Sequence, residues 1–296
     1  MSRDTTTSVL FDAPGPRARR RNLLLTLVAA ALLVGLVVIA LGRLDARGEL
    51  EAAKWEAMFT RSAWVNYFLP GILRTLRAAA VAVVLAVVFG LVFGMGRVSS
   101  NRAVRIVSGV VVEFFRGIPV LIMMIAFFYF VAYRAVFEPT TNPFVAVVAA
   151  LTLYNGAVIA ELVRSGVGSL PAGQAEAGLS VGLTPGQTMR AIQLPQAITA
   201  MLPALVGQLV VVLKDSALGA IITYPELLRS ARNLAAGGNT LQPLVVAAVL
   251  FIVINLALTT LAGLLERRIN RRGRTAATAD KDADPVVETG IGGGGT

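Results

Sequence analysis

Apolar residues come in long, nearly unbroken blocks along this chain, separated by short polar stretches rich in Gly, Pro and Arg. A helix needs about 20 apolar residues to cross the hydrocarbon core of a bilayer. Six blocks are long enough, and they cover residues 22–42, 71–96, 106–133, 143–163, 197–223 and 241–265. The pattern therefore predicts an all-α polytopic membrane protein with six transmembrane helices.

The charges beside these blocks predict how the chain is oriented. Arginine dominates the N-terminal flank, the turn at 97–105, the loop at about 165–196 and the C-terminal flank, whereas the opposite flanks mix acidic and basic residues. Because connections rich in Lys and Arg stay on the cytoplasmic side, we expect both termini and the 165–196 loop to be cytoplasmic. The chain would then be a multi-pass protein of the cell membrane.

Composition narrows the function. The chain is 56% hydrophobic with a formal net charge of +10, and its arginines cluster at the ends of apolar blocks, which favours a role in topology over nucleic-acid binding. The sequence contains no Cys and no His, which excludes disulfides, thiol chemistry, haem, zinc and a histidine base. No carboxylate cluster indicates a metal site, so we expect no cofactor and no catalytic residue.

The segments outside the blocks have separate roles. Residues 1–21 form a basic tail, and the helix at 22–42 is expected to be an uncleaved anchor, because its apolar run is longer than a signal-peptide core. The extracytoplasmic connector at 43–69 carries Trp55 and Trp64 and is expected to form an interfacial helix. Residues 268–296 are polar, and we expect them to be disordered.

The 165–196 loop is punctuated as two short helices. Pro171 suits a first helical position, and Gly182 supplies the left-handed residue that closes the helix at 172–181. Thr184-Pro185-Gly186-Gln187 is a capping box for the second helix, which we expect to end before Pro195. The loop is therefore predicted to be a stiff helical hairpin.

A motif in this loop resembles a motif of a known protein family. The motif begins with Glu176-Ala177-Gly178, continues after three residues with Gly182, and ends after a further nine residues with Ile192-Gln193-Leu194-Pro195. It follows the pattern E-A-A, three residues, G, nine residues, I-x-L-P. The loop resembles the EAA loop of permease subunits in bacterial ATP-binding cassette (ABC) importers. Gly178 replaces the second alanine, a small-for-small change that we expect to be minor. The stretches "EFFRGIPVLI" and "LKDSALGAIITYPELL" further resemble polar amino acid permeases, and the latter looks nearest to the glutamate type.

The resemblance implies a type I importer permease core of five helices at 70–267, preceded by one additional helix. It also implies two ATP-binding subunits that hold ATP and Mg, a second permease that we expect to be a different chain, and an extracytoplasmic solute-binding protein. The chain has no G-x-x-x-x-G-K-[S/T] phosphate loop, so we expect it to transport without hydrolysing ATP. The residues expected to couple to the ATPase are Gln174, Glu176, Ala177, Gly178, Gly182, Ile192, Leu194 and Pro195.

Polar residues inside the blocks are candidates for the substrate path, because a charge at bilayer depth costs a few kcal/mol. The candidates are Glu113, Arg116, Tyr154, Glu161, Lys214 and Asp215. Glu113 and Arg116 share a helical face just before Gly117 and Pro119, where the helix could break. Tyr154 and Glu161 lie on one stripe with Ala150, Ala157 and Arg164. If the substrate is glutamate, Arg116 and Lys214 are the candidates for its side-chain carboxylate.

Small residues recur at every fourth position of the second block: Ala78, Ala82, Ala86, Gly90 and Gly94. Such a stripe lets helix backbones approach closely, either within the subunit or across a dimer.

The preferred hypothesis is an amino acid importer permease, for glutamate or another acidic or polar amino acid, that works by alternating access. A permease for glutamine or a basic amino acid is one alternative. Another is an ion-coupled secondary carrier with Glu113, Glu161 and Asp215 as a proton relay, although no inverted repeat of broken helices is evident. A membrane enzyme would need a nucleophile or base arrangement, and the sequence offers none.

Overall fold

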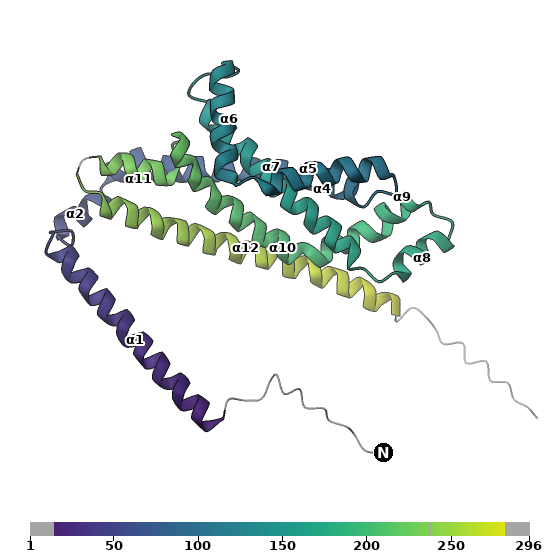
Figure 1. Cartoon of the computed structure of the whole chain (residues 1–296), viewed down its shortest axis with the longest axis horizontal. Coiled ribbons are helices and arrows are strands. Elements are labelled where there is room, and N and C mark those ends of the chain that lie inside the picture. The colour runs from purple at the N-terminus through teal and green to yellow at the C-terminus, as the bar shows by residue number, and fades with distance from the viewer. Residues whose placement is uncertain (1–14, 237, 282–296) are drawn as a thin grey trace, which may run out of the picture. The chain divides into compact units, whose positions relative to one another are not determined.

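The computed structural model describes residues 15–236 and 238–281, with side chains described up to residue 264, and this part of the chain is helical apart from short connections (Figure 1). It divides into two units, Met1–Phe59 and Thr60–Thr296. In the described part of the chain, five helices are long and apolar enough to cross a membrane, or six if one sharply bent pair is a single span. The prediction of an all-α polytopic protein is confirmed.

The first unit is built around one long apolar helix. It contains α1 (Pro16–Asp45), α2 (Ala52–Glu56) and a 3₁₀ turn (Ala57–Phe59). No residue of α1 is buried, although the helix is strongly apolar. A helix that is apolar on all sides needs an apolar environment, as expected of a membrane span. The helix begins at Pro16, so it includes arginines that we expected in the N-terminal tail.

The second unit contains the remaining helices. They are α3 (Arg61–Ala63), a π-helical turn (Trp64–Phe68), α4 (Leu69–Arg97), α5 (Arg102–Gly117), α6 (Val120–Arg134), α7 (Asn142–Gly168), α8 (Gly173–Ser180), α9 (Pro185–Thr188), a second π-helical turn (Met189–Gln193), α10 (Leu194–Asp215), a 3₁₀ segment (Ser216–Ile222), α11 (Leu227–Ala235) and α12 (Leu241–Lys281). Within this unit, α8 and α9 lie at one end and α11 at the other (Figure 1).

Two helices begin or end at positions that differ from the predicted segment boundaries. The connector expected at 43–69 ends earlier, because Thr60 caps a continuous helix Arg61–Arg97 by accepting a hydrogen bond from the backbone N–H of Ala63. The tail expected to be disordered from residue 268 is helical to Lys281, where alanines and long charged side chains favour helix. Residues 1–14 and 282–296, also assigned to tails, lie outside the described part of the chain.

The core of the second unit is the packing of α4 against α7. The small stripe on α4 faces this contact, where Ala78, Ala82 and Ala86 are fully buried. A Cβ added to Gly94 would lie 2.7 Å from the Cβ of Val163, so the helices approach as closely as glycine allows. The stripe therefore packs within the subunit, which settles the question that the sequence left open.

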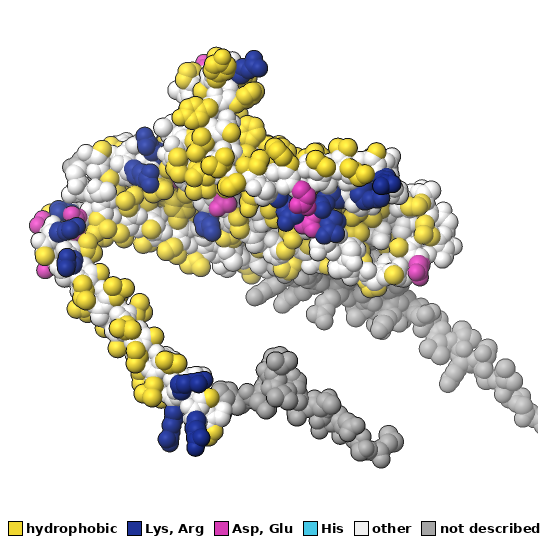
Figure 2. Space-filling model, in the orientation of Figure 1, with side chains coloured by type: hydrophobic (Ala, Val, Ile, Leu, Met, Phe, Trp, Pro, Cys, Tyr) yellow, Lys and Arg dark blue, Asp and Glu magenta, His cyan; other side chains and the backbone are white. Residues whose placement is uncertain are grey.

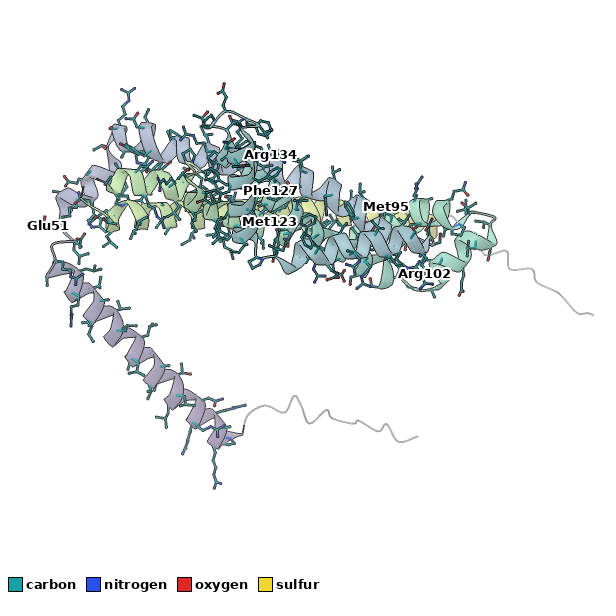
Figure 3. The ribbon with its side chains drawn as sticks, turned by 45° about the horizontal axis from the view of Figure 1, so that its top comes forward. Glu51, Met95, Arg102, Met123, Phe127 and Arg134 are labelled. Carbon is teal, nitrogen blue, oxygen red and sulfur yellow. The ribbon has the colours of Figure 1, made fainter. Side chains whose placement is uncertain are left out.

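The third predicted block is a broken span. α5 ends at Gly117 and α6 begins after Pro119, with a bend of 97° between them. Pro119 has no N–H to donate, and the residue before a proline is held in an extended conformation, as Ile118 is here. The predicted break is confirmed. α6 leaves the bundle at this point and carries Met123 and Phe127, with Arg134 as its last residue (Figure 3).

The end of the unit at α11 is fixed by buried polar contacts. The backbone N–H of Leu227 donates to Thr75 Oγ1 (3.1 Å), and Glu226 accepts hydrogen bonds from the backbone N–H groups of Leu228 and Arg229 (2.8 and 2.7 Å). Glu226 is fully buried, and this burial raises its pKa to about 7 despite those two donors. The first turn of α11 is thereby held against α4.

Candidate functional site

The 165–196 loop folds into the predicted helical hairpin. Gly182 has φ +84°, its N–H donates to the carbonyl of Leu179 (3.0 Å), and the N–H of Leu183 donates to the carbonyl of Gly178 (3.1 Å). This pair of bonds is the Schellman ending of a helix, which requires a left-handed residue at this position. Gly182 therefore closes α8 and reverses the chain, as the sequence predicted.

The second arm of the hairpin begins with the predicted capping box. The hydroxyl of Thr184 accepts from the N–H of Gln187 (3.4 Å), and Gln187 Oε1 accepts from the N–H of Thr184 (2.8 Å). The two arms are also tied at their open end, where Gln196 Nε2 donates to Gln174 Oε1 (2.9 Å).

The expectation that the second helix ends before Pro195 is wrong. The chain is continuously helical from Pro185 to Ile222. A π-helical turn at Met189–Gln193 precedes the proline, and the N–H of Leu194 donates to the carbonyl of Met189. The wider turn accommodates a residue that lacks the N–H and whose ring would crowd a regular helix. The second arm is therefore continuous with the span α10.

The interior of the hairpin is packed more tightly than the sequence suggested. Gly178 is buried, and a Cβ at this position would lie 2.5 Å from Thr188 Cγ2 and 3.1 Å from Ile192 Cδ1. The replacement of the second alanine by glycine is therefore not minor, because glycine lets the arms approach. Ile192 belongs to this contact, and Leu194 packs against the buried cluster of Ala86, Ile159, Val163 and Met201.

The outer face of α8 is free of contacts within the described part of the second unit. Glu176 and Ala177 are exposed, and no side-chain hydrogen bond or ion pair of Glu176 is found there. Leu179 and Val181 are 49% and 76% exposed. Pro195 is exposed as well. The motif thus separates into residues that shape the hairpin and residues that are available to a partner.

Three of the candidate path residues belong to one charged cluster. Arg97 Nη1 lies 2.9 Å from Glu113 Oε1 and 3.0 Å from Glu161 Oε2, which joins α4, α5 and α7. Arg164 Nη2 lies 2.6 Å from Glu161 Oε1. Arg116 is held less tightly, at 3.3 Å from Glu113 and 3.8 Å from Glu161. Three guanidinium groups therefore share two carboxylates.

This charged cluster faces outward on the second unit. Figure 2 shows acidic and basic side chains gathered on an otherwise largely apolar face. The side chains of Glu113, Arg116 and Arg164 are 57%, 37% and 46% exposed. Because each charge turned toward lipid would cost a few kcal/mol, the face must meet water or another polar surface. The sequence analysis missed Arg97, which lies at the end of its block and was taken only as a topology signal.

The other candidates lie elsewhere. Tyr154 is half-buried against the main core, and Ala150 and Ala157 of its stripe are fully buried, so the stripe is mostly packing. Lys214 is exposed and Asp215 half-buried at the end of α10. No hydrogen bond or ion pair joins them to the charged cluster in the described residues.

A buried polar contact between α7 and α10 was also missed. Gln208 Nε2 donates to Asn155 Oδ1 (2.5 Å), and Asn155 is fully buried. The sequence indicates this contact only through an amide side chain within an apolar block.

Comparison with known proteins agrees with this architecture. Residues 86–271 match the family model of the binding-protein-dependent transport system inner membrane component. The chain is 45% identical over 251 residues to the glutamate transport system permease protein GluD of Corynebacterium glutamicum, which covers 83% of this chain and 92% of that protein. It is 35% identical over 205 residues to the probable glutamine ABC transporter permease protein GlnP of Bacillus subtilis (67% and 91%).

Solved structures show the same fold. An amino acid ABC transporter crystallised with histidines matches with a TM-score of 0.64 and 30% identity, over 72% of this chain and 98% of that one. A methionine ABC transporter in an inward-facing conformation matches in fold, with a TM-score of 0.60 and 22% identity over 70% and 97%. Permeases of this family are not catalytic themselves, and ATP is handled by separate subunits. The chain therefore belongs to the binding-protein-dependent transport system inner membrane components, as a permease subunit of an ABC importer of the polar amino acid type.

Proposed function

We propose that this permease imports glutamate, or another acidic or polar amino acid, by alternating access. The observation that carries the mechanism is the hairpin, because its outer face is exposed while its second arm continues into a span. The relative named for glutamate supports the substrate, and the relative named for glutamine keeps that amino acid as an alternative.

In this proposal the hairpin couples the permease to two ATP-binding subunits, which hold ATP and Mg. Glu176, Ala177 and the turn at Gly182 enter the ATPase surface, and the exposed Leu179 and Val181 add apolar contact area. Since α9, the π-helical turn and α10 form one helix, a displacement of the hairpin moves α10 directly.

The proposed orientation places the hairpin and both termini in the cytoplasm. The hairpin lies beside the basic α4–α5 turn, since Ser99 and Arg105 line the same cavity as Leu179. Arginine-rich connections stay on the cytoplasmic side. The opposite end, at α11, then faces the solute-binding protein, and the second permease of the importer is a different chain.

Arg116 and Lys214 are proposed to attract the side-chain carboxylate of the substrate. Arg116 is the least tightly paired guanidinium of the charged cluster, and Lys214 is exposed without an ion pair in the described residues. They belong to different helices and share no contact there, so each would act at its own point along the path.

The coupling proposal is tested by charge reversal in the complete importer. Glu176→Arg should prevent the ATP-binding subunits from co-purifying, whereas the control Glu138→Arg, at an exposed site in the α6–α7 connection, should not. ATP-driven uptake into vesicles should also continue after the proton gradient is collapsed. Normal assembly of Glu176→Arg would refute the docking surface, and loss of uptake with the gradient would indicate a secondary carrier.

The substrate proposal is tested by neutralising both cations. The double substitution Arg116→Gln and Lys214→Gln should abolish glutamate uptake and leave the affinity of the solute-binding protein intact. Arg102→Gln, which removes one exposed positive charge outside the proposed path, serves as the control for each single substitution. Normal uptake by the double variant would refute the assignment. Competition of labelled glutamate with unlabelled glutamine and arginine identifies the amino acid carried.

A further inference from the structure

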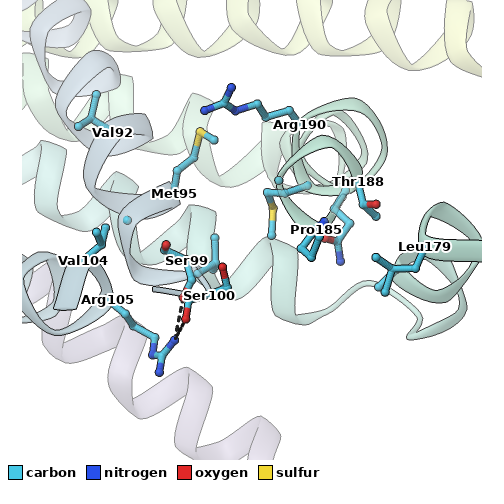
Figure 4. A pocket seen from close by; sticks show the side chains of 16 residues that line it. Val92, Met95, Ser99, Ser100, Val104, Arg105, Leu179, Pro185, Thr188 and Arg190 are labelled. Carbon is cyan, nitrogen blue, oxygen red and sulfur yellow. Dashed lines mark hydrogen bonds between the residues drawn. The ribbon is translucent and has the colours of Figure 1, made fainter. Parts of the chain in front are cut away.

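A cavity of about 580 Å³ lies between the helical hairpin and the α4–α5 turn. One wall comes from the end of α4, the turn and the start of α5, and the other from α8, α9 and the π-helical turn at Met189–Gln193 (Figure 4). Its size is that of a small-molecule site. No candidate residue of the substrate path lines it, and of the residues proposed to contact the ATPase only Leu179 does.

The cavity is positively charged. Arg105 and Arg190 line it, and none of its other lining residues is acidic. Arg105 Nη1 donates to the backbone carbonyls of Ser99 (2.7 Å) and Ser100 (3.5 Å), which are neutral acceptors. Arg190 is exposed and has no ion pair in the described residues. Two guanidinium charges are therefore left without a carboxylate, and the complementary ligand is an anion.

The rest of the lining is mainly apolar. Val92 and Met95 of α4, Val104 of α5 and Leu179 of α8 form its walls (Figure 4). Val92 and Val104 are 61% and 44% exposed, and Val92 lies within the span Arg61–Arg97. The cavity is thus continuous with a surface that is apolar enough to face lipid. A free inorganic anion has no use for such walls, whereas an acyl chain fits them.

We propose that this cavity binds one anionic phospholipid from the leaflet on the side of the hairpin. The phosphate lies at Arg190, and an acyl chain lies along α4 at Val92. Arg105, which is held at the serine turn on the other side of the close-up, adds positive charge to the cavity (Figure 4). A lipid held there contacts both the hairpin and the bundle, so it stabilises the position of the hairpin whichever amino acid is carried.

The experiment measures lipid retained by the purified, complete importer. The complex is exchanged into nanodiscs of phosphatidylcholine containing a minor fraction of phosphatidylglycerol, re-extracted in detergent, and its bound lipids are quantified by mass spectrometry. The unmodified complex should retain phosphatidylglycerol selectively. Since a basic residue near a membrane contributes about 1 kcal/mol to binding of an anionic lipid, Arg190→Gln should reduce retention about fivefold.

Matched variants separate a built site from general surface charge. Arg190→Lys keeps the charge and should retain the lipid. Arg102→Gln removes an equal charge from the exposed first turn of α5 and should also retain it, because Arg102, labelled in Figure 3, does not line the cavity. An equal loss in Arg102→Gln and Arg190→Gln would overturn the proposal. So would equal retention of the two lipids, or complete displacement of phosphatidylglycerol by millimolar inorganic phosphate. Because retention is measured without transport, a different substrate would leave this result unchanged.

Discussion

The substitution Gly178→Ala tests whether close packing inside the hairpin sets its shape. Gly178 lies in α8, and the added Cβ would lie 2.5 Å from Thr188 Cγ2, 2.8 Å from Thr188 Oγ1 and 3.1 Å from Ile192 Cδ1. Thr188 is β-branched and only 2% exposed, so it cannot turn aside freely. The two arms must therefore separate to admit one methyl group.

Two opposing terms set the size of the effect. Overpacking a well-filled site costs about 1–3 kcal/mol. Alanine is better than glycine inside a helix by about 1 kcal/mol, which offsets part of this cost. The net destabilisation of the hairpin is then about 1 kcal/mol, or about a fivefold rise in its local opening constant. A Gly→Ala substitution at a surface position of the same helix should show only the stabilisation that comes from the higher helix propensity of alanine.

Amide hydrogen exchange over residues 173–193 of the assembled importer measures this opening. Gly178→Ala should exchange about fivefold faster. Adding Thr188→Ala should restore the protection seen in Thr188→Ala alone, since it removes the two Thr188 atoms that lie closest to the added Cβ. Gly173→Ala is the matched control, because a Cβ there has no atom within 4 Å. Equal protection of the Gly178 and Gly173 variants, or no rescue by Thr188→Ala, would refute the reasoning.

Three further predictions follow from other contacts. Arg97→Met should lower the melting temperature of the importer by more than Arg116→Gln does, because Arg97 contacts both Glu113 and Glu161 within 3.0 Å. Equal shifts in melting temperature would mean that Arg97 does not hold the charged cluster together. Since the folded-state pKa of Glu226 is raised from 4.5 to about 7, its contribution to stability is complete below about pH 4.5 and is lost as the pH rises through 7. Thermal unfolding of Glu226→Gln should lack this component, and an unchanged pH profile would contradict it. Asn155→Leu should destabilise the protein by about 1–3 kcal/mol, because it leaves Gln208 without its partner. A double variant that also carries Gln208→Leu should cost less than the sum of the two single substitutions. Strict additivity of the two free energies of unfolding would show that the amides do not interact.

Local signals predicted several features of this protein correctly. Block length gave the spans, Gly117 and Pro119 gave the break between α5 and α6, and Gly182 gave the closure of α8. Each of these depends on residues adjacent in the chain: the apolar length needed to cross a bilayer, a missing N–H, or a positive φ. The same local rule failed at Pro195, because a π-helical turn relieves the proline without ending the helix.

The sequence by itself therefore determined the fold class, the spans and the presence of a helical hairpin, because these follow from short-range geometry and hydrophobicity. Only the tertiary structure decided that Gly178 must be glycine, that Arg97 joins Glu113 and Glu161, and that Arg105 and Arg190 line one cavity. These contacts join segments that are separated along the chain, and no spacing rule encodes the distance between them. Packing of α4, α5 and α7 and closure of the hairpin bring the side chains together, so their energies exist only in the folded bundle.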